Sequence, residues 1–156
     1  MDVNLYRAVA ADAALVAGAI QRERLGTDIG VENKGALDLV TEVDRACEVA
    51  ILARLRRSFP THDFVAEESA PSLSGSEHVW YIDPLDGTTN YAHTYPFFCT
   101  SIALTRKGTV IASAVYDPVK DELFTAARGR GATCNGLPLK VSPSREILRS
   151  VFLTGF

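Results

Sequence analysis

The spacing of the apolar residues changes near Pro60, and no other feature of the sequence limits the fold as strongly. Before this point two stretches carry apolar residues at helical spacing, which predicts two helices. The first covers about twenty alanine-rich residues, and its expected apolar face consists of Leu5, Val9, Leu15, Ala19 and Ile20. The second begins near Asp44 and ends before Pro60, because a residue that precedes proline disfavours helical angles. Its expected apolar face consists of Ala46, Val49, Leu52 and Ala53.

After Pro60 the sequence consists of short β-rich runs separated by turn residues. The expected strands are residues 64–66, 79–82, 97–105, 110–116, 122–127 and 132–134. Asn135-Gly136 is the strongest hairpin signal among the turns between them. Two helices followed by hairpin strands predict an α+β domain, in which both helices pack on one face of a largely antiparallel sheet.

Residues 150–156 also read as a strand, and nothing follows them to cover their apolar side chains. Natural proteins usually protect exposed apolar strands, because such strands associate with one another. We therefore expect residues 1–156 to form one domain that is part of a longer protein or that completes itself against a partner.

Composition excludes several classes of function. A net charge of −3 provides no basic surface for nucleic acid. The three cysteines are far apart and include no CxxC pair, which favours reduced thiols over a disulfide framework or a zinc site. No apolar run approaches the ~20 residues of a membrane span, and the N-terminus lacks the order of a signal peptide. We expect a cytoplasmic protein with no nucleic-acid or membrane partner.

The stretch WYIDPLDGTTNYAH, residues 80–93, places Asp83 and Asp86 on either side of a proline at the end of an expected strand. The two carboxylates and the carbonyl of Leu85 could face one point, and Mg²⁺ prefers such oxygen ligands. Gly87 and Thr88 would then open a helix, whose free N–H groups bind phosphate well. The alternative is a plain turn with Asp86 as the helix N-cap, and the stretch alone leaves both interpretations open.

Two further acidic positions could join this site. Glu67 follows the strand 64–66, so it lies at a strand end as Asp83 does, although an exposed acidic loop is the simpler interpretation. Thr41 and Asp44 have the spacing of a capping box at the start of the second helix. Because that box prefers Glu or Gln at its last position, Asp44 could instead be directed at a water molecule.

Five stretches carry a resemblance to a known family: DLVTEVD, VAEES, WYIDPLDGTTNYAH, YPFFCTSIAL and AVYDPVKDELFTAARGRGATCNG. In order and spacing, from about Lys34 to Phe156, the chain resembles the inositol monophosphatase family of Mg²⁺-dependent, lithium-sensitive phosphatases. The resemblance implies the N-terminal half of a layered α/β/α/β/α sugar-phosphatase fold, and a homodimer.

The resemblance also implies a set of metal ligands. Glu67, Asp83, the carbonyl of Leu85 and Asp86 match the metal-binding positions, with Asp83 bridging two ions. Two or three Mg²⁺ ions are implied, with Mn²⁺ as a possible substitute. Ala66 stands where the family usually has glycine.

Other matching positions imply roles in phosphate binding and in catalysis. Gly87 and Thr88 match the residues that hold the phosphate through backbone N–H groups, next to Asp86. The Thr88 hydroxyl and Asp44 match the pair that orients the attacking water, and Glu67 takes part in the reaction as well as in metal binding. Lys34 is placed like the family lysine on a loop near the third metal.

The implied reaction is hydrolysis of a small phosphate monoester, most simply inositol monophosphate, by a metal-activated water. Paired cations lower the pKa of a bound water and neutralise the leaving oxygen, so no covalent nucleophile is needed. Neither Cys99 nor Cys134 has an evident partner base, and the histidines, His62, His78 and His93, show no ligand spacing.

One family feature has no match in the chain. The family takes a further metal-binding aspartate from a Trp-Asp motif in its second half, whereas Asp117 and Asp121 belong to the turn VYDPVKDE. We therefore expect this chain to represent the N-terminal portion, with weak Mg²⁺ binding and little or no activity alone. Fructose 1,6-bisphosphate, 3′-phosphoadenosine 5′-phosphate and histidinol phosphate stay open as substrates, and so does a role as a non-catalytic interaction module.

Overall fold

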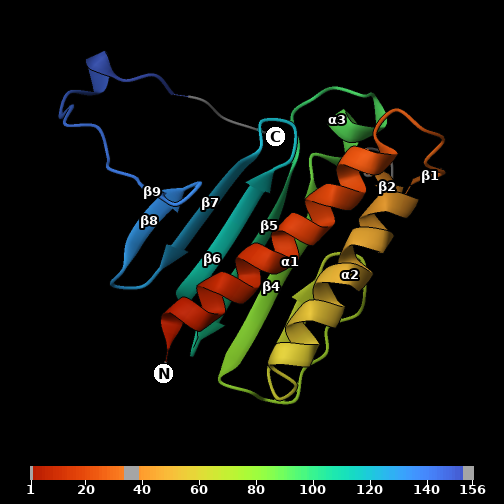
Figure 1. The fold of residues 1–156 in the computed structure, drawn as a ribbon, viewed down its shortest axis with the longest axis horizontal. Helices are drawn as coiled ribbons and strands as arrows, with labels where there is room; N and C mark the ends of the chain where they lie inside the picture. The colour runs from red at the N-terminus through yellow and green to blue at the C-terminus, as the bar shows by residue number, and fades with distance from the viewer. Residues whose placement is uncertain (1, 34–38, 153–156) are drawn as a thin grey trace.

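Two helices lie side by side on one face of a seven-stranded sheet in the computed structural model, which describes residues 2–33 and 39–152 (Figure 1). The two long helices are α1 (Val3–Arg24) and α2 (Glu42–Ser58). The strands of the sheet are β3 (Asp63–Ala66), β4 (His78–Asp86), β5 (Cys99–Arg106), β6 (Thr109–Asp117), β7 (Glu122–Ala127), β8 (Gly131–Cys134) and β9 (Leu137–Pro138). The smaller elements are β1 (Val31–Asn33) paired with β2 (Leu39–Thr41), α3 (Thr88–Ala92) and a 3₁₀ turn (Ile147–Arg149).

Strand order in the sheet follows the sequence from β3 to β9, and only the β3–β4 pair is parallel. The predicted α+β class and the largely antiparallel sheet are confirmed. The Asn135-Gly136 hairpin is confirmed too, because both residues have the positive φ angles, 48° and 80°, that a tight hairpin turn requires. The predicted strand at 150–156 is wrong where it can be checked: Ser150 to Phe152 have no regular structure, and residues 153–156 lie outside the described ranges.

The buried face of α1 is not the predicted one. Leu5 and Leu15 are 53% and 40% exposed, whereas the core contains Tyr6, Ala10, Ala13, Ala14, Ala17, Gly18 and Gln21. The alanines and the glycine of this face let the α1 backbone lie close to α2 and β6, so close approach decided the burial more than hydrophobicity did. In α2 the predicted face is right at Leu52, which is buried, and wrong at Ala46, Val49 and Ala53, which are exposed; Cys47 and Ile51 are buried in their place.

By length and composition alone, α1 could cross a membrane, although the sequence had suggested no such segment. In the structure its small-residue face packs against α2 and β6. This is the packing of a helix in a protein core.

The second face of the sheet, called here the open face, has no helix over it within the described residues (Figure 1). On this face lie Val65, Tyr81, Ala103, Val115 and Phe124, because they alternate along their strands with residues buried under the helices. Tyr81 is 47% exposed and Phe124 is 36% exposed. The candidate site lies on the open face, at the end where β4 finishes.

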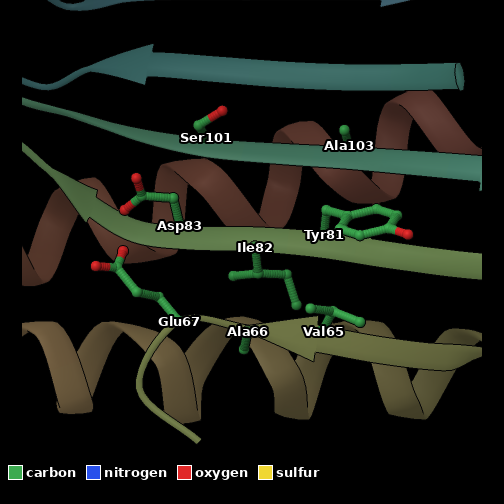
Figure 2. A pocket seen from close by; sticks show the side chains of 8 residues that line it. All are labelled: Val65, Ala66, Glu67, Tyr81, Ile82, Asp83, Ser101 and Ala103. Carbon is green, nitrogen blue, oxygen red and sulfur yellow. The ribbon is translucent and has the colours of Figure 1, made fainter. Parts of the chain in front are cut away.

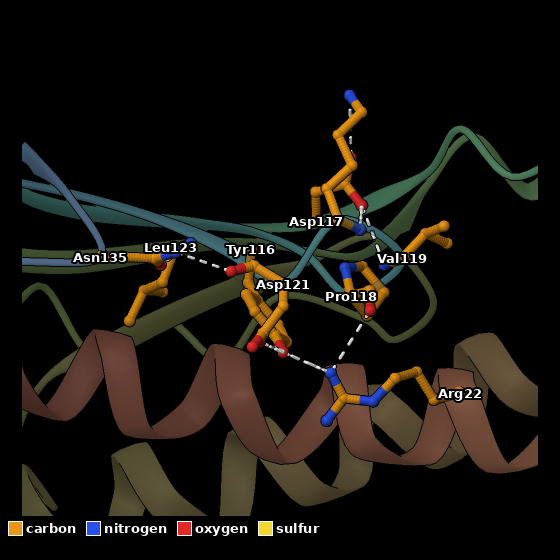
Figure 3. Close-up of polar contacts among 9 residues, drawn as sticks. Arg22, Tyr116, Asp117, Pro118, Val119, Asp121, Leu123 and Asn135 are labelled. Carbon is orange, nitrogen blue, oxygen red and sulfur yellow. Dashed lines mark hydrogen bonds and ion pairs between the residues drawn. The ribbon is translucent and has the colours of Figure 1, made fainter.

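Polar contacts fix the turn between β6 and β7 against α1 (Figure 3). The Tyr116 hydroxyl donates to Asp121 Oδ1 at 2.6 Å, and Arg22 of α1 donates to that hydroxyl and to the carbonyl of Pro118. Asp117 Oδ1 accepts the N–H groups of Val119 and Lys120, both at 2.9 Å. The carboxylates of Asp117 and Asp121 therefore serve the turn, as the sequence predicted.

Replacing Gly18 by alanine is expected to destabilise the protein, although alanine is the better helix former. A Cβ at Gly18 would lie 2.3 Å from the Tyr116 ring, which is buried in the core. We expect the free energy of unfolding to fall by about 1–3 kcal/mol, as for other overpacked sites, and urea denaturation measures it. Ala19→Gly at the neighbouring exposed position reports helix propensity alone. A more stable Gly18→Ala variant would contradict this close packing.

Candidate metal and phosphate site

One extra residue in β4 brings Asp83 and Asp86 to the same face of the sheet. Asp83 lies opposite Ser101 and Asp86 lies opposite Cys99, so three steps along β4 match two steps along β5. Such a bulge leaves the extra residues out of the ladder, and bulges are among the few sheet positions that tolerate proline, here Pro84. Because Ser101 and Cys99 share a face, their partners share it too. The two aspartates thus share one face of the sheet, through a bulge that the sequence analysis did not foresee, and their convergence on one point stays a prediction.

Glu67 and Asp83 point toward each other at the ends of two neighbouring strands (Figure 2). Parallel pairing puts Ala66 beside Ile82, so the next residues, Glu67 and Asp83, lie together at the edge of a shallow pocket on the open face. The prediction that two strand ends present their carboxylates together is confirmed.

The electrostatics of Asp83 suit a cation ligand. Burial, followed by the nearby carboxylates of Glu67 and Asp86, raises the pKa of Asp83 to about 7, and the pair shares a hydrogen bond between Asp83 and Glu67. Asp83 Oδ1 is buried and has no hydrogen-bond partner. Buried carboxylate oxygens normally have partners, so this orphan atom fits a site that holds a positive charge.

The carboxylates of Glu67, Asp83 and Asp86 do not surround a common point in this structure. In the part of the chain that the structure describes, no three His, Cys, Asp or Glu side chains are grouped so that they could hold a metal ion. The exposed Asp86 instead has the Cys99 thiol 3.7 Å from its Oδ2. In this arrangement Glu67 and Asp83 lie side by side, and the raised pKa of Asp83 reflects its burial and the two neighbouring carboxylates. Lys34 lies outside the described residues.

Asp44 serves as a helix cap and as a partner of Thr88 at the same time. Its Oδ2 accepts the backbone N–H of Thr41 at 2.8 Å and the Thr41 hydroxyl at 2.5 Å, which completes a capping box. Its Oδ1 lies 2.8 Å from Thr88 Oγ1. The capping box predicted from sequence is confirmed, and it leaves Oδ1 for Thr88, whereas an Asp44 side chain directed at a water molecule stays a prediction.

Thr88 opens the short helix α3, directly after the bulge. Gly87 precedes it with φ +95°, and a Cβ there would lie 3.1 Å from the carbonyl oxygen of Phe97, so only glycine suits this turn. Thr88 Oγ1 also lies 3.0 Å from the carbonyl oxygen of Leu85. The first N–H groups of a helix have no partner within it, so Gly87 and Thr88 offer donors beside the carboxylates.

Two residues that the sequence analysis missed support the bulge in β4 through hydrogen bonds on the helix side of the sheet. Gln21 of α1 is fully buried, and its Nε2 donates to the carbonyl of Pro84 at 2.9 Å and to Thr100 Oγ1 at 3.0 Å. The Thr100 hydroxyl donates to the same carbonyl at 3.1 Å. The one available signal was a glutamine in an alanine-rich helix, on the side that the sequence predicted to be exposed.

The thiols are unsuited to nucleophilic catalysis. All three cysteines are free. Burial, followed by the carboxylates of Asp86 and Asp83, raises the pKa of Cys99 to about 12. Burial and Asp44 raise the pKa of Cys47 to about 12 as well. Because the thiolate is the reactive form, neither residue is activated for attack.

The histidines lie away from the carboxylates, as expected from their spacing. The rings of His62 and His78 stack at 4.6 Å at the opposite end of β4, where Trp80 Nε1 donates to His62 Nδ1 at 3.1 Å. His93 is exposed after α3. None of them reaches the site.

Comparison with known proteins identifies the family. The model of the inositol monophosphatase family matches residues 2–156. Inositol monophosphatase 2 of Solanum lycopersicum is 44% identical over 151 residues, which are 94% of this chain and 57% of the relative. Nus factor SuhB of Pseudomonas aeruginosa is 48% identical over 137 residues, which are 86% of this chain and 50% of the relative. The chain belongs to the inositol monophosphatase family, and it spans about half the length of these relatives.

Solved structures show the same fold. The extragenic suppressor protein suhB of Bartonella henselae matches with a TM-score of 0.85 and 41% identity, over 88% of this chain and 54% of that one. An IMPase/NADP phosphatase in complex with Mg²⁺ and phosphate matches with a TM-score of 0.73 and 32% identity, over 83% and 50%. A staphylococcal inositol monophosphatase in an inhibitory complex soaked in LiCl matches with a TM-score of 0.82 and 28% identity, over 92% and 55%.

In the absence of metal, Asp83→Asn is expected to stabilise the chain at high pH. The pKa of Asp83 is about 7 in the folded state and about 4 when unfolded. Between these values the unfolded chain has released a proton that the folded chain still binds, so the free energy of unfolding falls as the pH rises, and it stays low above pH 7. Asparagine does not ionise and avoids this loss.

Thermal unfolding in EDTA tests this expectation. At pH 8 we expect Asp83→Asn to melt a few degrees above the original chain, and the difference should disappear near pH 4. Asp28→Asn, at an exposed position, controls for the loss of one negative charge. A gain of the same size at both pH values would show that the ionisation of Asp83 is not responsible.

Proposed function

We propose that this chain supplies the metal- and phosphate-binding part of a Mg²⁺-dependent hydrolase of small phosphate monoesters, most simply inositol monophosphate. The observation that carries the proposal is the pair of carboxylates of Glu67 and Asp83, with a buried oxygen that lacks a partner. Membership of the inositol monophosphatase family supports it, and so does the solved relative that contains Mg²⁺ and phosphate. In this proposal, residues 1–156 form the N-terminal metal- and phosphate-binding domain.

The carboxylates of Glu67, Asp83 and Asp86 and the carbonyl of Leu85 would hold two or three Mg²⁺ ions, or Mn²⁺ in their place. All four groups lie on or beside the bulge and the end of β3. When bound, paired cations lower the pKa of a coordinated water and neutralise the leaving oxygen.

The remaining roles fall to groups around Thr88. Its hydroxyl has one proton and lies within hydrogen-bonding distance of both Asp44 Oδ1 and the Leu85 carbonyl. When it donates that proton to Asp44, its oxygen can accept a hydrogen from an attacking water and orient it. The N–H groups of Gly87 and Thr88 would hold the phosphate beside Asp86, and Glu67 would take part in activating the water.

We further propose a cytoplasmic, lithium-sensitive homodimer without a membrane partner. Three free thiols suit a reducing compartment, and one solved structure of a staphylococcal relative is an inhibitory complex soaked in LiCl. The expected lack of a nucleic-acid partner rests on the net charge of −3 and stays a prediction, since several relatives bear the name Nus factor.

We expect the 156-residue chain to bind Mg²⁺ weakly and to turn over little substrate. Only two aspartates follow Asp86 in the sequence, Asp117 and Asp121, and both serve the β6–β7 turn, so neither is free to replace the family's further aspartate. The test measures Mg²⁺-dependent release of phosphate from inositol 1-phosphate, together with Mn²⁺ binding, for the original chain and Asp83→Asn.

Two results would change this proposal. Robust turnover that Asp83→Asn abolishes would show that the site is complete, for example through a second copy of the chain, and would overturn the expected low activity. Mn²⁺ binding that is the same in both proteins would overturn the assignment of the site itself.

A further inference from the structure

Glu48 is a buried acid that the proposed chemistry does not use. It lies on α2 and is 4% exposed. Burying a carboxylate is costly unless it is well hydrogen-bonded. Glu48 Oε2 accepts the backbone N–H of Glu68 at 2.7 Å, so its one described contact is with the residue that directly follows Glu67.

Glu48 and Asp44 form a pair on the buried face of α2, one helical turn apart. Like charges at this spacing repel each other and destabilise a helix slightly. Each of the two nonetheless contacts a segment that carries a proposed ligand. Asp44 accepts a hydrogen bond from Thr88, two residues after Asp86. Glu48 accepts one from the N–H of Glu68, the residue after Glu67. One rigid helix thereby contacts both sides of the carboxylate set.

The two sides differ in how firmly the strands hold them. Asp83 lies within the paired β4–β5 ladder, opposite Ser101. The β3–β4 ladder, in contrast, ends at Ala66 and Ile82, so Glu67 and Glu68 follow the last paired residue of β3. The hydrogen bond from the Glu68 N–H to Glu48 holds the backbone one residue beyond Glu67.

We propose that Glu48 is a positioning residue, which fixes the separation of the Glu67 and Asp83 carboxylates by anchoring the Glu68 backbone to α2. The proposal rests on the proposed function in one respect, namely that this carboxylate pair binds a cation. Groups that orient metal ligands typically change metal affinity by about 10–100-fold when they are removed. In this role Glu48 needs a side chain long enough to reach the Glu68 N–H and an oxygen that accepts its hydrogen bond. Its negative charge is not required.

Two variants of Glu48 separate the effect of its side-chain length from the effect of its charge. Glu48→Asp keeps the charge but shortens the side chain by one methylene, so its oxygen can no longer lie 2.7 Å from the Glu68 nitrogen without backbone movement. Glu48→Gln loses the charge but keeps an acceptor oxygen at the same reach. Glu23→Gln, at an exposed position on α1, controls for the loss of one negative charge elsewhere.

Two measurements on the 156-residue chain provide the readouts. The first is the hydrogen-exchange protection of the Glu68 amide in the metal-free protein. The second is the affinity for Mn²⁺, followed by the paramagnetic resonance signal of the free ion, with Asp83→Asn as the reference for a damaged site. We expect Glu48→Asp to lose the protection and about tenfold in Mn²⁺ affinity, and Glu48→Gln to keep the protection and to stay within about threefold of the original affinity.

The other outcomes are decisive in different ways. Full protection and full Mn²⁺ affinity in Glu48→Asp would overturn the proposal, and so would a larger loss in Glu48→Gln than in Glu48→Asp, since charge would then be the cause. If Asp83→Asn binds Mn²⁺ as well as the original chain does, the proposed function fails. The protection of the Glu68 amide still decides in that case whether Glu48 anchors this backbone.

Discussion

The shared hydrogen bond between Asp83 and Glu67 is the interaction on which the site depends. It requires two strand ends to stop side by side, and it keeps two carboxylates together that would otherwise repel each other. Gln21 and Thr100 support one side through the carbonyl of Pro84. Both long helices therefore contact the site directly. Helix α1 supports the bulge in β4, and α2 forms hydrogen bonds with Thr88, after the bulge, and with Glu68, after β3.

Local signals predicted the sheet well. The strands and the Asn135-Gly136 turn follow from residues close together in the sequence. The contact between Glu67 and Asp83 needs in addition that two such strands pair and end side by side. The face of α1 was predicted wrongly, because periodicity weighs Leu15 above Ala14, whereas a close helix contact selects the smaller side chain. The face of α2 was right only at Leu52. Nothing in the sequence pairs Gln21 with Pro84, 63 residues apart, so such supports appear only when the chain is folded.

Asp44 shows why a structural and a functional interpretation of one residue need not compete. A carboxylate has two oxygens, and the capping box of α2 uses one of them. The other is bonded to Thr88, so the start of the helix and the orientation of that hydroxyl are fixed together. The short side chain of aspartate, unusual at this position of a capping box, keeps the carboxylate close to both partners.

The bulge in β4 also explains why two residues separate Asp83 from Asp86. Two steps along a regular strand would already place two carboxylates on one face. The third step leaves Pro84 and Leu85 without ladder partners, and it frees the carbonyl oxygen of Leu85 to face Thr88. A shorter segment could keep both acids aligned and would return that carbonyl to the ladder. The spacing of the motif thus places a third oxygen beside the two carboxylates, one that no side chain provides.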